Sequence, residues 1–260
     1  MLISVITVVK DDLPGLKATA KSLRSQDFAD WEWLVKDGGS TDGTAQAIPE
    51  LQPAPAWRES AADAGIYDAM NQALPHAGGE WVLFLNAGDT LSEPTTLSRV
   101  AAILTESPRQ WVFGSVRNIA PDGHSTGWQS ASPFNQLGLA MGQTTVPHQA
   151  TFMRRELLKR LGGFRLDFGT EADQELIYRA SLQGPPTEIV WPIADFRVGG
   201  AGMQRPTGHF AVAMRRARRE QGQRLGGNAA FDAIATAGLL AKEYAKAGEA
   251  ALIRRLHRGN

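Results

Sequence analysis

The sequence has 260 residues, of which 43% are hydrophobic and 21% are charged, and its 27 Lys and Arg residues balance 27 Asp and Glu residues. This composition is typical of a globular protein with one large or two small domains and excludes a disordered chain. Zero net charge excludes a chain-wide nucleic-acid-binding surface, and the absence of cysteine excludes disulfides, thiolate nucleophiles and zinc–thiolate sites.

The N-terminal segment MLISVITVVK has neither the basic start nor the cleavage site of a signal peptide. No apolar stretch approaches the ~20 residues that are needed to span a bilayer. We therefore expect a cytoplasmic protein that at most rests peripherally on the inner face of the membrane.

Strands and helices alternate in the first 90 residues. The short β-branched segment ISVITVV is typical of a buried parallel strand, and Asp12 precedes apolar residues at helical spacing. Strands are predicted at 3–9, 31–35 and 80–86, and helices from Asp12, from Thr41 or Asp42, and over 66–74. This alternation predicts a mostly parallel sheet with helices on its faces.

Three of these predicted strands end in acidic loops, at Asp11 and Asp12, at Asp37 and at Asp89. In such sheets ligands bind at the carboxyl ends of the strands. Converging carboxylates repel one another, so we expect a cation or a hydrogen-bonding ligand among them. Any one of these residues alone is better explained as an ordinary loop or cap aspartate, but the three together favour a site.

The second half of the chain is less regular. Two strand-like segments flank the turn at 120–123, which predicts an antiparallel hairpin. The stretch 133–147 has little periodicity and is a candidate binding lid. A strand at 148–155, helices ending at Gly162 and Gly184, and the segment PTEIVWPIADFRVGG at 186–200 complete the core.

Several strings resemble, in their order, the motifs of family 2 glycosyltransferases: ISVITVVKDD, LVKDGGSTDGT, DAGIYDAMNQAL, GEWVLFLNAGD, LGGF and EADQELIYR. The resemblance covers roughly residues 1–200, and GIYDAMN and LFLNAGD are most similar to the branch that builds bacterial exopolysaccharides such as colanic acid. It implies a GT-A fold, which is a Rossmann-like α/β fold with a mixed, mostly parallel sheet. It also implies an NDP-sugar donor, a divalent metal and an inverting transfer.

The resemblance assigns several residues to the donor. Asp37 matches the acid that accepts a hydrogen bond from the nucleotide base, with Asp11 close by, and backbone groups of Thr7 and Val9 are expected beside the base. For Asp37 the alternative is a cap of the GGSTDG loop.

The DAGIYDAMN segment is implied to contact the sugar and the ribose of the donor, through Asp63, Asp68 and Asn71. Asp68 and Asn71 lie three residues apart on one face of the predicted helix. A solvated helix face is the alternative for this pair.

The string NAGD occupies the metal-binding position of the family, where Asp89 matches the acid that binds Mg²⁺ or Mn²⁺. Asn86 and Gly88 stand where the commonest pattern has further acids, and both are expected at the donor. A single carboxylate predicts weak metal binding in the absence of nucleotide. An ordinary turn is the alternative, and it explains Gly88 but not the other acidic strand ends.

Asp173, in the first turn of a predicted helix, resembles the general base of the family, with Glu171 as the reserve. It would take the proton of an acceptor hydroxyl during a single displacement. His148 and Gln149 follow the long loop and are expected on the acceptor side or near the metal. For His148 a packed, hydrogen-bonded histidine is the alternative.

The balanced charge conceals a split along the chain. Residues 205–260 carry 11 Lys and Arg against 4 Asp and Glu, a net of +7, which leaves 16 against 23, a net of −7, for residues 1–204. We expect a glycosyltransferase domain at 1–204, with a nucleotide-sugar half at 1–116 and an acceptor half at 117–204, and a basic helical extension at 205–260. This extension would contact an anionic membrane surface, the acidic domain or another subunit.

The predicted function is transfer of a sugar from an NDP-sugar donor to a saccharide or polyprenyl-linked acceptor in the synthesis of bacterial surface polysaccharide. One alternative is a catalytically weak nucleotide-sugar-binding protein, because the NAGD motif has lost acids. A second is a sugar nucleotidyltransferase, although KDDLPG is acidic where a triphosphate needs positive charge. A dehydrogenase is disfavoured because no GxGxxG follows the first strand.

Overall fold

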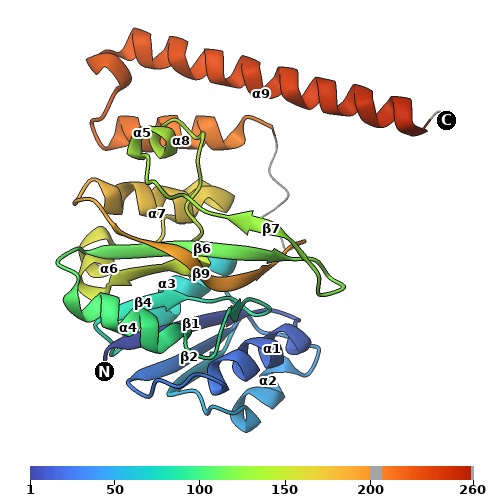
Figure 1. Ribbon diagram of the computed structural model, residues 1–260, viewed down its shortest axis with the longest axis vertical. Coiled ribbons are helices and arrows are strands. Elements are labelled where there is room, and N and C mark those ends of the chain that lie inside the picture. The colour runs from blue at the N-terminus through green and yellow to red at the C-terminus, as the bar shows by residue number, and fades with distance from the viewer. Residues whose placement is uncertain (200–206, 259–260) are drawn as a thin grey trace.

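The structure is a computed structural model that describes residues 1–199 and 207–258, and in the last helix it describes side chains only as far as residue 245, with 243 left out. Its described strands form one mixed sheet in the order β3-β2-β1-β4-β8-β6-β9-β5, with β7 paired to β6 (Figure 1). The strands are β1 (Ile3–Val9), β2 (Trp31–Asp37), β3 (Trp57–Ser60), β4 (Trp81–Phe84), β5 (Thr90–Leu91), β6 (Trp111–Ile119), β7 (Ser125–Gln129), β8 (Thr151–Arg154) and β9 (Thr187–Arg197).

The sheet changes character halfway across. Strands β1 to β4 pair in parallel, whereas β8 runs antiparallel to both β4 and β6. The β6–β7 hairpin is antiparallel, and β9 returns parallel to β6 and antiparallel to β5. The predicted α/β class, the parallel N-terminal half and the hairpin are therefore confirmed.

Helices cover both faces of the sheet and enclose two separate apolar cores. One core packs α1 and α4 against the sheet and the other packs α3, α6 and α7, with buried residues such as Leu16 in the first and Leu176 in the second. The helices are α1 (Leu13–Arg24), α2 (Thr44–Ala47), α3 (Ile66–Ala73), α4 (Thr96–Glu106), α5 (Gln136–Ala140), α6 (Arg155–Leu161), α7 (Ala172–Ser181), α8 (His209–Glu220) and α9 (Ala229–Arg258).

Caps decide where the first two helices begin. The Asp12 carboxylate accepts the Gly15 N–H at 3.0 Å and caps α1, as its position in the sequence predicts. The predicted start of α2 at Thr41 or Asp42 is wrong by two or three residues. Asp42 instead accepts the Thr44 N–H at 3.0 Å, which closes a turn before the helix.

The stretch 133–147 is only partly a loop. The Asn135 side chain accepts the Gly138 N–H and starts the short helix α5, whose Leu139 is buried in the core. At Gly142 the chain touches α8 so closely that a Cβ there would lie 2.7 Å from Ala211 Cα. This half of the expected lid is therefore packed against the body, and only Thr145 and the residues after it reach the cavity described below.

The basic extension is joined to the same body. Helices α7, α8 and α9 lie one above another beyond the sheet, and α9 projects past the rest of the protein (Figure 1). Met214 and Ala217 of α8 are buried in the core that contains α7, so the apolar stripe of α8 is not available to a membrane. The expected boundary between residues 204 and 205 lies outside the described residues. In the part of the chain that the structure describes, no helix is long and apolar enough to cross a membrane.

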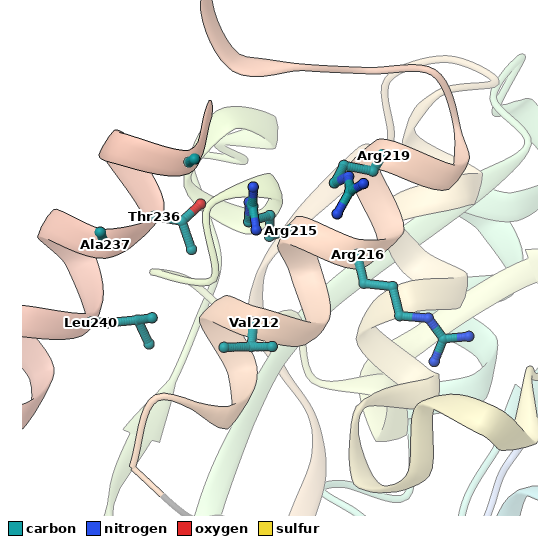
Figure 2. A pocket seen from close by; sticks show the side chains of 8 residues that line it. Val212, Arg215, Arg216, Arg219, Thr236, Ala237 and Leu240 are labelled. Carbon is teal, nitrogen blue, oxygen red and sulfur yellow. The ribbon is translucent and has the colours of Figure 1, made fainter. Parts of the chain in front are cut away.

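The seam between α8 and α9 combines a buried ion pair with an open groove. Arg218 and Asp232 are 2% and 1% exposed, and their side chains pair at 2.9 Å. Above them, Arg215, Arg216 and Arg219 border a groove that Val212 and Leu240 line (Figure 2). Arg215 also pairs with Asp232, and Arg216 pairs with Asp167 in the turn before α7, so much of the basic charge is neutralised internally.

Candidate active site

A cavity of about 580 Å³ opens where the ends of β4 and β9 meet the first turns of α3 and α7. This volume is in the usual range for a small-molecule site. Five residues singled out from the sequence line it: Asn86, Asp89, His148, Gln149 and Asp173. The structure thus brings the expected metal, acceptor and base residues to one place, although they are far apart in the sequence.

The NAGD turn at the end of β4 is fixed by a buried residue of α1. The Thr19 hydroxyl donates to the Asp89 carbonyl at 2.7 Å and accepts the Gly88 N–H at 3.0 Å. Gly88 has a φ of +93°, a conformation that other residues rarely adopt. The turn is therefore a rigid platform beneath the cavity.

Asp89 is a buried acid whose hydrogen bonds and charged neighbours do not offset the cost of burying its negative charge. Its side chain is 4% exposed, and its Oδ1 accepts the Arg197 backbone N–H at 3.1 Å. Burial raises the pKa of Asp89 to about 7, although that hydrogen bond, the nearby His148 and Arg197 and a hydrogen bond from Gln149 each lower it. A ligand that carries positive charge would stabilise the ionised form.

A chain of hydrogen bonds crosses the cavity from the NAGD turn to α7. Asn86 Nδ2 lies 3.2 Å from His148 Nε2, and His148 Nδ1 lies 3.2 Å from Asp173 Oδ2. If Asn86 donates to Nε2, the histidine is neutral and its Nδ1–H donates to the carboxylate. His148 therefore links the donor side of the cavity to the expected base.

Asp173 is held in the first turn of α7 by its neighbour. Gln174 Nε2 donates to Asp173 Oδ2 at 3.0 Å and to the Val146 carbonyl at 2.9 Å, which also ties α7 to the loop after α5. Glu171 is fully buried in the turn before α7, next to His209 Nδ1 at 3.4 Å, and it does not line the cavity. The geometry thus favours Asp173 over Glu171 as the base.

The loops after β1 and β2 form a second polar cluster beside the cavity. Asp37 is fully buried, and its carboxylate accepts hydrogen bonds from Ser40 and from Ser60 Oγ at 2.5 Å. Asp11 accepts the Thr41 N–H at 2.7 Å, which joins the two loops. Asp37 therefore acts as the cap of its loop in this structure, as the alternative interpretation predicts, and it faces the loop rather than the cavity.

Other expected donor residues lie outside the cavity. Asp63 Oδ1 accepts the Gly65 N–H, and Asp68 Oδ2 accepts the Ala64 N–H, both at 2.9 Å, so each stabilises the entry to α3. The carbonyl of Val9 accepts the Gly38 N–H.

Thr7 and Asn71 are structural residues here. Thr7 is fully buried inside the sheet, where its hydroxyl donates to the Leu85 carbonyl and accepts from Trp33 Nε1. Asn71 makes two hydrogen bonds of 2.8 Å to the backbone of Phe164, in the LGGF string. The Asn71 amide is therefore used within the fold, whereas the expectation for Thr7 concerns its backbone groups and stays a prediction.

Arg197 is a charged cavity residue that was not singled out from the sequence. Its guanidinium pairs with the Asp12 carboxylate and lies directly over Gly88, where a Cβ would be 2.4 Å from Arg197 Cζ. Its position depends on the antiparallel pairing of β5 with β9, which places Thr90 opposite Asp195. The only signal available in advance was a basic residue at the end of the last core strand.

The residues at the NAGD turn fit a divalent cation only in part. Asp89 offers one carboxylate, and within residues 1–199 and 207–258 Asn86 Oδ1 is a buried acceptor with no hydrogen-bond donor. Among the same described residues no group of three or more His, Asp and Glu side chains is arranged to hold a metal. Two oxygen ligands suit Mg²⁺ or Mn²⁺ when phosphate oxygens and water complete the shell.

Comparison with known sequences identifies the family. Residues 4–162 match the model of the family described as Glycosyl transferase family 2. The chain is 37% identical over 207 residues to an uncharacterized glycosyltransferase of Mycobacterium tuberculosis H37Rv, covering 78% of each protein. It is 34% identical over 182 residues to a PGL/p-HBAD biosynthesis glycosyltransferase of Mycobacterium bovis BCG, covering 68% of this chain and 69% of the relative.

Solved structures share the fold at lower sequence identity. The Staphylococcus aureus TarS fragment 1–349 in complex with UDP-GlcNAc aligns with a TM-score of 0.68 at 21% identity, over 85% of this chain and 66% of that one. A mannosyltransferase from Pyrobaculum calidifontis in complex with GDP-Man and Mn²⁺ aligns with a TM-score of 0.59 at 23% identity, over 84% of this chain and 63% of that one. This chain thus spans just under two thirds of the length of either structure, and the shared fold is the GT-A fold of glycosyltransferases. By its sequence match and its fold, the chain belongs to glycosyl transferase family 2 and is a glycosyltransferase.

Proposed function

We propose that this glycosyltransferase is inverting and moves a sugar from an NDP-sugar to a hydroxyl group of a saccharide or lipid-linked acceptor in the synthesis of bacterial surface polysaccharide. The observation that carries the proposal is that Asp173 and the NAGD turn face one cavity, connected through His148. The nucleotide sugars bound to the two structural neighbours support the donor class. The exopolysaccharide branch remains a prediction, since the relatives reported above are mycobacterial.

The arrangement suits a single displacement. The acceptor oxygen attacks the anomeric carbon on the face opposite the diphosphate, its proton passes to Asp173, and the electron pair of the breaking C–O bond leaves with the diphosphate. Residues of 1–116 then provide most contacts to the nucleotide sugar and residues of 117–204 most contacts to the acceptor, and both halves line the cavity. Closure of the cavity around the sugar would keep water from competing with the acceptor.

Asp89 and Asn86 are the residues that would hold Mg²⁺ or Mn²⁺ together with the donor phosphates. A divalent metal there supplies neutralisation of the charge that develops on the leaving diphosphate. Because the protein contributes so few ligands, metal binding should depend strongly on the presence of nucleotide.

The test combines a donor screen with one isosteric substitution. Thermal shift with UDP-, GDP- and dTDP-sugars, with and without Mn²⁺, identifies the donor. Asp173→Asn should then lower transfer or donor hydrolysis by about 10²–10⁴-fold while donor affinity is kept. The anomeric proton of the product, observed by NMR, reports inversion.

Two further variants serve as controls for this test. Asp122→Asn, in the exposed turn of the β6–β7 hairpin, should leave activity unchanged. Glu171→Gln tests the reserve base. Full activity in Asp173→Asn would contradict the assigned base, and a wild-type protein that binds donors without ever reacting would favour a nucleotide-sugar-binding protein instead.

For the acceptor side we propose that α9 and the end of α8 rest on an anionic membrane surface. Phe231, Ile234 and Tyr244 of α9 are large apolar side chains that are 53%, 70% and 59% exposed. Exposed Arg219, Arg224 and Lys242 lie on the same two helices and the turn between them, so apolar and basic groups occur together as lipid binding requires.

Vesicle flotation tests this placement. The triple variant Arg219→Ala, Arg224→Ala and Lys242→Ala should bind phosphatidylglycerol vesicles at least ~10-fold more weakly, at about 1 kcal/mol for each charge. The matched control replaces Lys17, Lys21 and Arg24, which are exposed on α1 at the far end of the molecule (Figure 1). Deletion from residue 205 is uninformative because it would remove Met214 from the core. Equal binding by both triple variants, or a stable dimer in light scattering that buries α9, would contradict the membrane placement.

A further inference from the structure

Arg197 is a cationic side chain in contact with the NAGD turn. Its guanidinium covers Gly88 and its backbone N–H binds the Asp89 carboxylate, so one residue contacts two members of the turn. The side chain is 44% exposed and lines the cavity together with Asp173 and His148. A positive group therefore stands at the position where the family pattern has an additional acid.

The guanidinium occupies the space over Gly88. A Cβ on Gly88 would lie 2.4 to 2.6 Å from three atoms of the guanidinium, and the φ of +93° disfavours any side chain. Asp89 is the acid of the NAGD turn, and the positive group of Arg197 lies over Gly88 in the same turn.

In the structure without ligand, Asp12 is the anion that Arg197 binds. The Asp12 side chain caps α1 through the Gly15 N–H and pairs with the guanidinium at the mouth of the cavity, and it is 27% exposed. A partly exposed pair of this kind contributes little stability and exchanges easily for a stronger anion. Phosphate is such an anion, because its oxygens accept two parallel N–H bonds from a guanidinium.

We propose that Arg197 is a donor-binding residue whose guanidinium leaves Asp12 and binds the diphosphate of the NDP-sugar, and that it stabilises the leaving group as the glycosidic bond breaks. This inference rests on the proposed function. In the reaction Arg197 keeps all its protons: the C–O electron pair goes to the diphosphate oxygen, and the acceptor proton goes to Asp173. Because a turn with a single acid binds a metal weakly, Arg197 supplies part of the positive charge that neutralises the leaving diphosphate.

Calorimetric titration with UDP, GDP and dTDP against UMP, GMP and dTMP, in EDTA, tests the inference. The wild-type protein should prefer the diphosphate of its own nucleotide by at least ~10-fold without metal, as two charge-assisted hydrogen bonds imply. Arg197→Ala should abolish this preference and leave monophosphate affinity unchanged. Arg197→Lys should retain only part of it, because an ammonium group lacks the planar fork. The control Arg99→Ala, which removes an exposed arginine stacked on Trp191, should change neither affinity.

Asp12→Asn tests the exchange, because an asparagine still caps α1 but releases the guanidinium. Diphosphate affinity should rise several-fold in this variant, and the gain should vanish in the double variant with Arg197→Ala. A preference for diphosphate that survives in Arg197→Ala, or a gain that persists in the double variant, would overturn the inference and leave the proposed function intact. A wild-type protein that binds none of the nucleotides or NDP-sugars, with or without Mn²⁺, would overturn both.

Discussion

Asp89 and Asp232 have almost equally buried side chains, but their pKa values are shifted in opposite directions. Burial raises the pKa of Asp89 to about 7. Burial acts in the same sense on Asp232, but hydrogen bonds from Arg218, Leu225 and Arg215 outweigh it and lower the pKa of that carboxyl. Asp89 lies in the cavity and Asp232 lies in the seam between α8 and α9. In the seam, hydrogen bonds from arginine outweigh the effect of burial on the carboxyl pKa, whereas at Asp89 burial outweighs the nearby His148 and Arg197.

The largest loss of stability should come from breaking the Arg218–Asp232 ion pair in the seam between α8 and α9. Asp232→Ala leaves the nearly buried Arg218 without its carboxylate, and removal of one partner of a buried pair costs about 3–5 kcal/mol. Urea unfolding should show this loss, while transfer activity per folded molecule stays close to that of the wild type. Unchanged stability would mean that the seam opens freely in solution.

Asp89→Asn should instead raise the free energy of unfolding, by an amount that depends on pH. An aspartate whose pKa is raised from 3.8 to about 7 favours the folded state below pH ~4 and loses that contribution as the pH rises through 7. The isosteric amide avoids this loss, so the variant should be more stable than the wild type by up to about 4 kcal/mol at pH 8 and equally stable near pH 4. Thermal unfolding at several pH values measures it.

The same substitution should reduce metal-dependent transfer strongly, so that stability and activity move in opposite directions. A stability gain that is the same at pH 4 and pH 8 would show that burial of the charge is not its cause. A variant that is as active as the wild type would contradict the role of Asp89 at the donor.

Acidification should weaken the seam instead. Since the pKa of Asp232 is lowered, the stability that it contributes is present at neutral pH and is lost as the pH falls below about 4 and through the folded pKa. The protection factors of α9 amides, which are corrected for the intrinsic pH dependence of exchange, should therefore fall below pH 4 in the wild type and should be low at every pH in Asp232→Ala. Protection factors in α9 that do not change with pH would contradict the importance of this pair.

Sequence patterns predicted the parts of this comparison that are local. Periodicity and caps predicted the alternating strands and helices. The strand-end rule and the motif resemblance singled out Asp89, and the resemblance singled out Asp173. These two residues and His148 line one cavity in the structure. The same rule was less informative for Asp37, because a carboxylate at a strand end serves a loop or a ligand equally well, and here Ser40 and Ser60 use it. Chemistry alone does not separate the two cases; the local hydrogen-bond donors do.

Positions that depend on long-range pairing could not be predicted. Arg197 reaches Asp89 across 108 residues, and only the register of β9 against β5 brings them together. Asn71 binds Phe164 across 93 residues. The motif resemblance implied a donor contact for Asn71, whereas its amide joins α3 to the LGGF string. Asp232 likewise gave no sign of its partner, since Arg215, Arg216, Arg218 and Arg219 are equivalent as a sequence pattern.

Asn71 is a neutral residue whose side-chain amide makes two hydrogen bonds to the backbone of Phe164. Asn71→Ala removes both hydrogen bonds to Phe164 and leaves a backbone N–H and a carbonyl to find other partners, at a cost of about 2 kcal/mol. Denaturant unfolding should show that loss, and donor affinity should be unchanged because the amide does not face the cavity. A specific loss of donor affinity with unchanged stability would restore the donor contact that the sequence suggested.

The smallest loss of stability is expected for alanine at Gly88, and a matched alanine at Gly43 distinguishes backbone strain from a role in donor binding. Gly88 and Gly43 have nearly the same φ, +93° and +94°, but a Cβ on Gly88 meets the Arg197 guanidinium whereas a Cβ on Gly43 meets nothing within 4 Å. Alanine at either site should cost about 1 kcal/mol for the left-handed backbone. Gly88→Ala alone should also displace the guanidinium and lower metal-free diphosphate affinity, with Gly43→Ala as the matched control. Equal affinities in the two variants would mean that the position of Arg197 over the turn has no part in donor binding, and the cavity would then depend on a metal for all of its positive charge.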